Sequence, residues 1–165
     1  MTFDLREHTA DVAIEATAPT LSALFEAVAD GLAAASCESA PETGERFAVS
    51  VSAESREALL FDFLDQLIYE RDVRLVLPVD HRCDVSARTE GDSGDHDGGD
   101  ERDDDEGGDE GDDDEGGEPS WTVEATARGV PLSDVAAREI KAVTYSEMTV
   151  ERRGDEWYAY VVLDV

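Results

Sequence analysis

The last nine residues of the chain, Trp157 to Val165, constrain the fold more than any other stretch of the sequence. In an extended strand, side chains point alternately to opposite sides, and this segment is apolar on both faces. One face carries Trp157, Ala159, Val161 and Leu163, and the other carries Tyr158, Tyr160 and Val162. A strand of this kind lies at the centre of a sheet that is covered on both sides, or it lies at an interface.

Two amphipathic helices are predicted upstream of this segment. Each begins after a residue whose side-chain oxygen suits an N-cap, Thr20 for the first helix and Ser55 for the second. Apolar residues then recur at helical spacing on one face of each segment. They are Leu21, Leu24, Phe25, Val28 and Leu32 in the first helix, and Leu59, Leu60, Phe63, Leu64, Leu67 and Ile68 in the second. We expect both stripes to pack against a sheet.

Alternating apolar and polar residues predict the remaining strands. The alternation runs through residues 3–16, 47–51, 83–87, 121–127 and 143–150, and a turn is expected at 153–155. Pro78 ends a short apolar run, and His81 follows it in a predicted loop. Two helices and six to eight strands favour the α+β class. We expect a single two-layer domain, residues 1–165, in which a mostly antiparallel sheet carries the helices on one side.

Residues 90–118 depart from this pattern. They include 17 acidic residues, 9 of the 13 glycines in the chain and a single basic residue, Arg102. A segment with so little apolar surface cannot offset the entropy of ordering, which predicts disorder. Its aspartates lack the spacing of an EF-hand calcium loop. Because strand-like alternation stops before the segment and resumes after it, we interpret it as a solvated hairpin insertion between two antiparallel strands.

Acidity extends beyond this insertion. The chain has a formal net charge of -29, and 25 acidic residues against 12 basic ones remain outside residues 90–118. Of the 13 basic residues only Lys141 is a lysine. Such a surface is typical of halophilic proteins, in which salt screens the self-repulsion; a protein from moderate salt with an acidic loop is the alternative. The lack of a basic stripe argues against direct nucleic-acid binding.

The sequence predicts no association with a membrane. No run reaches the roughly 18 apolar residues of a membrane-spanning helix, and the N-terminal residues lack the charged-then-apolar pattern of a signal peptide. We therefore expect a cytoplasmic protein. Cys37 and Cys83 stand alone in the sequence, which fits reduced thiols in that compartment.

Carboxylates near both ends of the chain are the candidate metal ligands. Asp11, Asp164 and the terminal carboxylate of Val165 would suit calcium or magnesium if the fold brought them together. The alternative is that Asp11 caps a turn and Asp164 ends a strand in solvent. Lys141 suits a phosphate or a carboxylate of a partner, unless it is an ordinary surface charge. The sequence has no Gly-x-Ser-x-Gly elbow and no glycine-rich phosphate loop before a helix.

Four motifs, read together, resemble the archease family. They are His8-Thr9-Ala10-Asp11 with the helix entry at Thr20-Leu21, Leu59-Leu60 with Gln66-Leu67-Ile68-Tyr69, the block Ile140-Lys141-Ala142-Val143-Thr144-Tyr145, and the ending from Trp157 to Val165. The resemblance covers the whole chain except residues 90–118. The block from Ile140 to Tyr145 and the ending are the most specific of these motifs.

The resemblance implies a function. Proteins of this family activate the RtcB-type tRNA-splicing RNA ligase: they promote its guanylylation and multiple turnover and broaden its nucleotide use. In the family a divalent cation, calcium, is held by the aspartate of the N-terminal motif and by the chain end, which correspond here to Asp11, Asp164 and Val165. Lys141 and His8 become the candidate residues for ligase activation. The implied role is that of an activator protein of tRNA splicing, and not of an enzyme.

Two other classes of function stay open at this point. One is a metal-dependent enzyme that acts on a phosphorylated small molecule through the same carboxylates, and the other is a chaperone-like binding module. The sequence also departs from the family pattern in two places. Ser146 stands where the family commonly has histidine, and residues 90–118 stand where the family has a short connection. We therefore expect no proton-transfer role for position 146.

Overall fold

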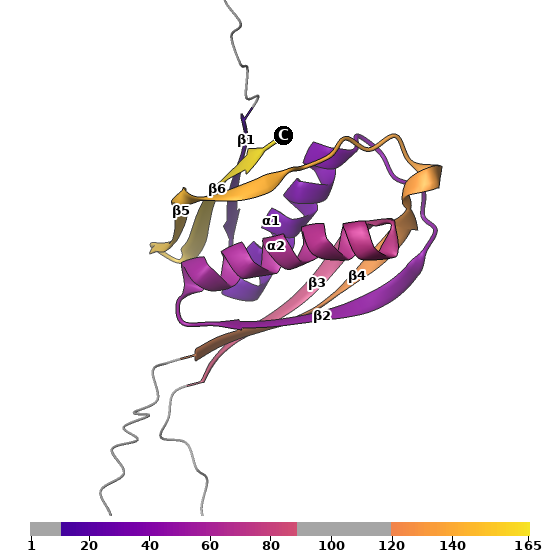
Figure 1. The fold of residues 1–165 in the computed structure, drawn as a ribbon. Helices are drawn as coiled ribbons and strands as arrows, with labels where there is room; N and C mark the ends of the chain where they lie inside the picture. The colour runs from indigo at the N-terminus through magenta and orange to yellow at the C-terminus, as the bar shows by residue number, and fades with distance from the viewer. Residues whose placement is uncertain (1–10, 89–119) are drawn as a thin grey trace, which may run out of the picture.

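The computed structural model describes residues 11–88 and 120–165, and this part of the chain folds into two α-helices, six strands and a short 3-10 helix (Figure 1). In chain order the elements are β1 (Asp11–Ala18), α1 (Leu21–Ser36), β2 (Glu45–Ala53), α2 (Arg56–Arg74), β3 (Val76–Arg88), β4 (Ser120–Pro131), η1 (Leu132–Asp134), β5 (Ala142–Arg153) and β6 (Glu156–Asp164). The predicted α+β class and its two main helices are confirmed. The predicted insertion, residues 90–118, lies outside the described residues.

The strands form two three-stranded sheets, in which every pair is antiparallel. The terminal sheet has the order β1-β6-β5, and the middle sheet has the order β2-β4-β3. From the sequence we expected one sheet with both helices on one side. Instead, each helix packs against strands of both sheets, and Figure 1 shows the helices between them. Paired apolar positions on each helix make the buried stripe wide enough to contact strands on two sides.

β6 is the central strand of the terminal sheet, as its two apolar faces predicted. Ala159, Val161, Val162 and Leu163 are all buried, so that both faces of the strand are covered along its second half. The turn that leads from β5 into β6 is also confirmed. Gly154 adopts a φ of 64° there, in the left-handed region that glycine enters without steric cost.

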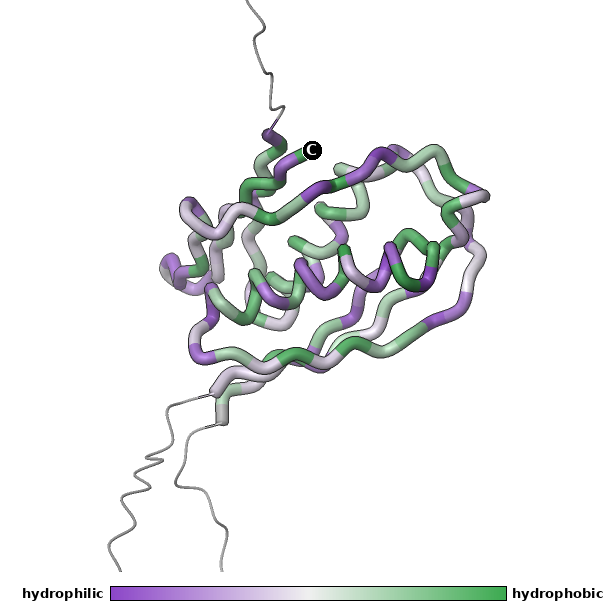
Figure 2. Tube along the Cα trace, in the orientation of Figure 1, coloured by the Kyte–Doolittle hydropathy of each residue, from purple (hydrophilic) through white to green (hydrophobic). Residues whose placement is uncertain are grey.

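Both predicted N-caps are confirmed. Oγ1 of Thr20 accepts a hydrogen bond from the main-chain N–H of Ala23 at 3.1 Å, and Oγ of Ser55 accepts one from Ala58 at the same distance. Figure 2 shows hydrophobic and hydrophilic positions interleaved along both helices, as amphipathic packing requires. Neither of the described α-helices is long and apolar enough to cross a membrane.

β3 and β4 pair as the sequence predicted for residues 83–87 and 121–127. β3 is longer than expected, because it begins at Val76 and includes Pro78 and His81, where a loop was predicted. The prediction of a loop was wrong because β3 is an edge strand of the middle sheet. At an edge, the missing N–H of a proline can face away from the hydrogen-bonded neighbour.

The outer edge of β3 is covered by side chains of α1. Three main-chain N–H groups on alternate residues of β3 donate to three side chains that lie four residues apart on α1. The N–H of Val85 donates to Ser22 at 2.9 Å, that of Cys83 to Glu26 at 2.8 Å, and that of His81 to Asp30 at 3.1 Å. Four helix residues and two strand residues span similar lengths, about 6 and 7 Å, so the two series match. We call this set of contacts the α1–β3 clasp.

Candidate functional site

The strand register gathers the predicted metal ligands at one edge of the terminal sheet. Asp11, the first residue of β1, is paired with Asp164, the last residue of β6. On the other side of β6, Ala142 is paired with the same Asp164, which places Lys141 next to this pair. Residues from both ends of the sequence therefore meet where β1 and β6 lie side by side, beside the C mark in Figure 1.

Asp11 and Asp164 project from the same face of the terminal sheet, because residues directly opposite each other in an antiparallel pair share a face. It is the face turned away from the helices, since the adjacent Val12 and Leu163 alternate with the aspartates and pack in the core. Like charges directly opposite each other destabilise a sheet. The pair is therefore unfavourable unless a cation or a hydrogen-bond donor compensates it.

The carboxylate of Asp164 lies in an unusual environment. Its Oδ1 atom is buried, and within residues 11–88 and 120–165 it has no hydrogen-bond partner. A buried polar atom without a partner costs about 1–3 kcal/mol, and more when it is charged. Folded proteins contain few such atoms, and each calls for a physical reason. Asp164 is therefore the clearest indication of a ligand site at this edge.

Lys141 is tied to the same point through its main chain. Its N–H donates to the main-chain oxygen of Asp164 at 2.8 Å, which holds the backbone of the only lysine beside the two aspartates. The residue is exposed, and it takes no part in the ion pairs of the described part of the chain. A compact ammonium group in this position can meet an anion that approaches from outside.

The donors at this edge fit a hard divalent cation in type. Carboxylate oxygens are the ligands that calcium and magnesium prefer, and the orphaned Oδ1 of Asp164 is available for one. Among the described residues no group of three or more His, Cys, Asp or Glu side chains is placed to hold a metal ion, so the aspartates need another donor. Val165 follows Asp164 and packs partly buried against the core. Its terminal carboxylate is the third donor that was predicted from the sequence.

His8 and Ser146 are two further positions that were singled out from the sequence. His8 lies outside the described residues. Ser146 is exposed and belongs to the part of β5 between Thr144 and Thr149, where the pairing with β6 shifts register.

The structure contains a second polar group that was not predicted from the sequence. The prediction had placed His81 in a loop. His81 is buried, and its Nδ1 lies 2.8 Å from Oδ1 of Asp30, the atom that also accepts from the main-chain N–H of His81. Asp80, which precedes it, has a φ of 50° at a shift of register in β3. Arg46 holds Asp80 by an ion pair of 2.6 Å and by a hydrogen bond to its main-chain oxygen. The four-residue spacing of polar side chains on α1 was the sequence signal for this group.

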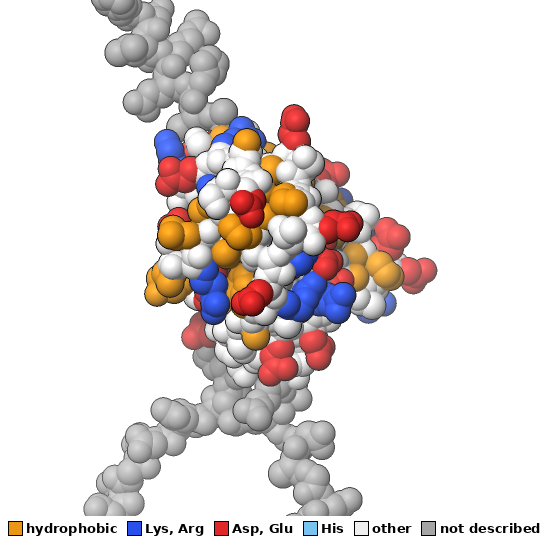
Figure 3. All heavy atoms as spheres, turned by 90° about the vertical axis from the view of Figure 1, so that its right-hand side faces the viewer, with side chains coloured by type: hydrophobic (Ala, Val, Ile, Leu, Met, Phe, Trp, Pro, Cys, Tyr) orange, Lys and Arg blue, Asp and Glu red, His pale blue; other side chains and the backbone are white. Residues whose placement is uncertain are grey.

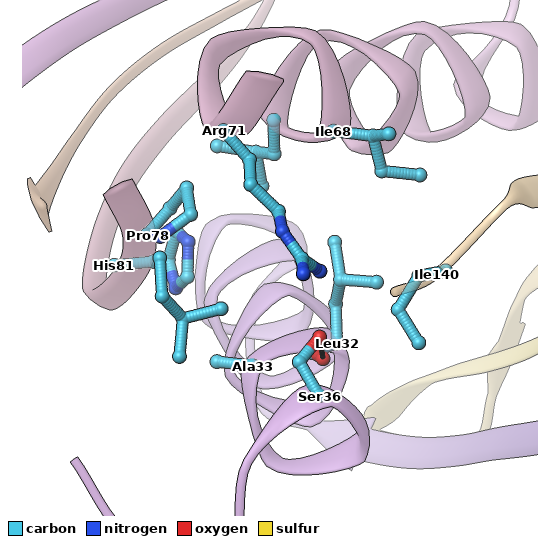
Figure 4. A pocket seen from close by; sticks show the side chains of 10 residues that line it. Leu32, Ala33, Ser36, Ile68, Arg71, Pro78, His81 and Ile140 are labelled. Atoms are coloured by element: carbon cyan, nitrogen blue, oxygen red, sulfur yellow. Dashed lines mark hydrogen bonds between the residues drawn. The ribbon is translucent and has the colours of Figure 1, made fainter. Parts of the chain in front are cut away.

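His81 lines a small cavity between α1, α2 and β3 (Figure 4). The cavity has a volume of about 20 Å³, room for about one water molecule, and its walls are mostly aliphatic. Figure 4 shows the side chain of Arg71 extending from α2 toward Ser36 of α1. Nε2 of His81 is buried and has no hydrogen-bond partner in the described part of the chain. This volume fits one ordered water better than it fits a substrate.

The clasp also sets the protonation of two groups. Partial burial raises the pKa of Asp30, but its hydrogen bonds to the side chain and main chain of His81 and their mutual charge attraction outweigh that effect and lower it. Burial raises the pKa of Cys83 to about 12, with a further contribution from the negative charges of Glu26 and Asp30. Cys83 is therefore a protonated thiol near neutral pH and a poor nucleophile.

The sequence matches a known family over almost its whole length. The model of the "Archease protein family (MTH1598/TM1083)" matches residues 3–165. "Protein archease" of Methanosarcina acetivorans is 26% identical over 99% of this chain and 95% of its own length. "Protein archease" of Thermococcus kodakarensis is 30% identical over 96% of this chain and 95% of its own length.

Two solved structures have a similar fold. The solution structure of protein 1598 of Methanobacterium thermoautotrophicum has a TM-score of 0.64 and 22% identity, and the match covers 99% of this chain and 96% of that one. The crystal structure from Thermotoga maritima, described as an archease and possible chaperone, has a TM-score of 0.58 and 21% identity over 100% of this chain and 98% of that one. At these identities the likeness concerns the fold alone.

Proposed function

This chain belongs to the archease family, and from that premise we propose that it is an activator protein of the RtcB-type tRNA-splicing RNA ligase. It promotes guanylylation and multiple turnover of the ligase and broadens its nucleotide use. Its own chemistry is that of a binding protein, and the reaction takes place on the partner. The acidic surface agrees with a protein partner better than with direct contact to RNA.

One observation carries the proposal: Asp11, Asp164 and the backbone of Lys141 meet at one strand edge. These are the positions at which the resemblance to the family implied a metal site and an activating residue. The sequence separates them widely, so only the register of the terminal sheet brings them together. Residues at the end of a sheet, two of them exposed, are well placed to enter a partner's active site.

We further propose that Asp11, Asp164 and Val165 hold a divalent cation, with calcium the expected one. The two carboxylates offer hard oxygens, and the orphaned Oδ1 of Asp164 gains a partner. A bound cation would supply positive charge where the nucleotide phosphates of the ligase lie. The cation would also relieve the repulsion between the two aspartates, so binding and stability are linked at this site.

Lys141 is the proposed activating residue. Its main-chain hydrogen bond to Asp164 holds it beside the proposed cation site, while its exposed side chain extends toward the partner. An ammonium group pairs with phosphate as a point charge and needs no fixed orientation. Lys141 would therefore stabilise negative charge on the nucleotide during its transfer to the ligase.

The experiment is single-turnover guanylylation of the cognate ligase with labelled GTP at high potassium chloride. We expect the protein to accelerate the reaction, and Lys141→Ala or Asp11→Ala to lose about 100-fold of that acceleration. Arg82→Ala and Asp84→Ala are matched controls, since both residues are exposed on β3 of the middle sheet, and they should act like the unaltered protein. No acceleration by the folded protein, with an active ligase, would refute the activator function.

A chaperone-like role is the second candidate. The structure from Thermotoga maritima is described as a possible chaperone, and this chain exposes two large apolar side chains on α2, Tyr69 and Val73. A chaperone would suppress the aggregation of unrelated unfolded clients at stoichiometric amounts. An activator would accelerate the ligase and leave the aggregation of such clients unchanged, so light scattering during heating of a client protein separates the two.

A further inference from the structure

The large apolar side chains that are exposed in the described part of the chain lie on α2, directly after it, or in contact with it. They are Tyr69 at 57% exposure, Val73 at 60%, Leu75 at 66% and Tyr145 at 51%. The first three lie in the last turns of α2 and directly after it. Tyr145 of β5 packs edge-to-face on Phe61 of α2, with 5.4 Å between ring centroids. We call Phe61, Tyr69, Val73, Leu75 and Tyr145 the α2 ridge.

We propose that the α2 ridge is the surface by which the protein docks on its ligase partner, an inference that rests on the proposed function. A docking surface needs a few large anchors that become buried on binding, and tyrosine is among the residues that most often carry binding energy. Tyr69 and Val73 on α2, Leu75 directly after it and Tyr145 on the adjoining β5 provide such anchors. Scattered exposed apolar residues need no explanation, whereas a group gathered on and next to one helix does.

The ridge adjoins the candidate functional site. Tyr145 follows Lys141 by four residues, and an extended strand rises about 3.3 Å per residue, so the start of the ridge lies within about 13 Å of the lysine backbone. From Phe61 to Val73 the ridge then follows α2 for about 18 Å. A partner seated on the ridge would therefore have its active site at the edge that carries Asp11, Asp164 and Lys141.

Charge on the ridge defines the chemistry of the partner surface. Asp62, Asp65 and Asp72 of α2 are exposed among the apolar positions, and none of them takes part in an ion pair of the described part of the chain. Complementarity requires apolar pockets for the tyrosines, with lysine or arginine at their rim. An enzyme that binds RNA carries basic surface of this kind.

The outer face of the middle sheet lacks these properties and serves as an internal comparison. Its exposed positions include Ala48, Ser50 and Glu124, which are small or charged and offer no large anchor. Figure 3 shows the end of the molecule at which α2 finishes, with hydrophobic side chains grouped at the left among arginines and acidic residues. The ridge is thus a local feature of the α2 side.

The test measures binding and activation separately. Fluorescence anisotropy of labelled protein gives the dissociation constant for the ligase without nucleotide, and guanylylation rates give the half-activating concentration and the maximal rate. We expect the double variant Tyr69→Arg, Val73→Arg to raise both the dissociation constant and the half-activating concentration at least about tenfold, with the maximal rate unchanged. Lys141→Ala should do the opposite, lowering the maximal rate with little change in binding.

The matched control is Ala48→Arg with Ser50→Arg, which adds the same charge to the middle sheet and should bind normally. Equal binding by the ridge variant and by the unaltered protein would overturn the docking proposal while activation stands. Self-association through the ridge would also overturn it, and sedimentation velocity would show this as a dimer that the ridge variant dissociates. Binding that depends on the ridge without any acceleration would support the docking surface and refute the activator function.

Discussion

Asp30 lies on α1 beside the edge of the middle sheet, Asp164 ends the central strand of the terminal sheet, and the surroundings of the two carboxylates are opposite. Asp30 accepts hydrogen bonds from the main chain of His81 and from its imidazole, which lowers its pKa. Asp164 stands opposite Asp11, and its buried Oδ1 has no partner among the described residues. The first carboxylate stabilises the fold, and the second weakens it locally. Local cost of this kind is expected where a site is built for a ligand.

The largest effect should follow removal of the Asp30 carboxylate. Asp30→Ala leaves the main-chain N–H and the imidazole of buried His81 without their acceptor. Each unsatisfied buried group costs about 1–3 kcal/mol, so we expect the free energy of unfolding to fall by about 2–4 kcal/mol. Urea denaturation measures it. Ser22→Ala removes one acceptor from the same α1–β3 clasp, and its free energy of unfolding should fall by less. An equal fall in both variants would contradict the special role of Asp30.

Lowering the pH should remove the stabilisation that the Asp30 carboxylate provides. Because the pKa of Asp30 is lowered below 3.8 in the folded state, the unfolded chain takes up this proton first as the pH falls. The stabilisation is complete above about pH 5 and is lost as the pH falls through 3.8 toward the folded pKa. Asp30→Asn keeps an acceptor but does not titrate. Its free energy of unfolding should therefore fall less than that of the unaltered protein between about pH 5 and pH 3, and parallel curves would refute this assignment.

Removing the charge of Asp164 should change the free energy of unfolding in the opposite direction. In the presence of a chelator, Asp164→Asn removes one of two opposed charges and the charge on a buried orphan atom. We expect the free energy of unfolding to rise by about 0.5–1 kcal/mol. Asp155→Asn, in the exposed turn between β5 and β6, is the control and should have no measurable effect. A loss of stability in Asp164→Asn would show that the carboxylate is satisfied in the folded protein.

An effect of similar size should follow removal of the side chain that links the two sheets. Arg56, at the start of α2, lies over Trp157 of the terminal sheet at 4.9 Å and over Trp121 of the middle sheet at 5.9 Å. Such cation–π contacts contribute about 0.5–1 kcal/mol at partly exposed sites. Arg56→Ala should lower the free energy of unfolding by about this amount and shift the tryptophan fluorescence. Arg56→Lys should keep part of the stabilisation. Unchanged emission in Arg56→Ala would contradict the contact.

The fold was largely predictable because its strongest signals are local. Thr20 and Ser55 identify the helix starts, and the two apolar faces of Trp157 to Val165 identify a central strand. The division into two sheets was not predictable, because it depends on which strands pair across long separations. The strand through Pro78 was missed for the same reason: only its place at a sheet edge makes the proline acceptable.

The candidate site was predictable in its residues and not in its geometry. Asp11, Lys141 and Asp164 were singled out by residue type and by resemblance to a family. Nothing in their spacing shows that β6 pairs with both β1 and β5, which is what brings the three together. The Asp30–His81 pair was missed because a histidine after a proline reads as a loop residue. Its partner lies on a helix far away in the sequence.

The most direct test of the strand-edge site is the change in the free energy of unfolding that calcium produces. At a calcium concentration about 100 times its dissociation constant, the unaltered protein should gain about 2–3 kcal/mol. Asp30→Asn should keep this gain, whereas Asp11→Asn and Asp164→Asn should lose it. Calcium stabilisation that is the same in Asp164→Asn as in the unaltered protein would show that the cation binds elsewhere, and the site at the ends of β1 and β6 would be refuted.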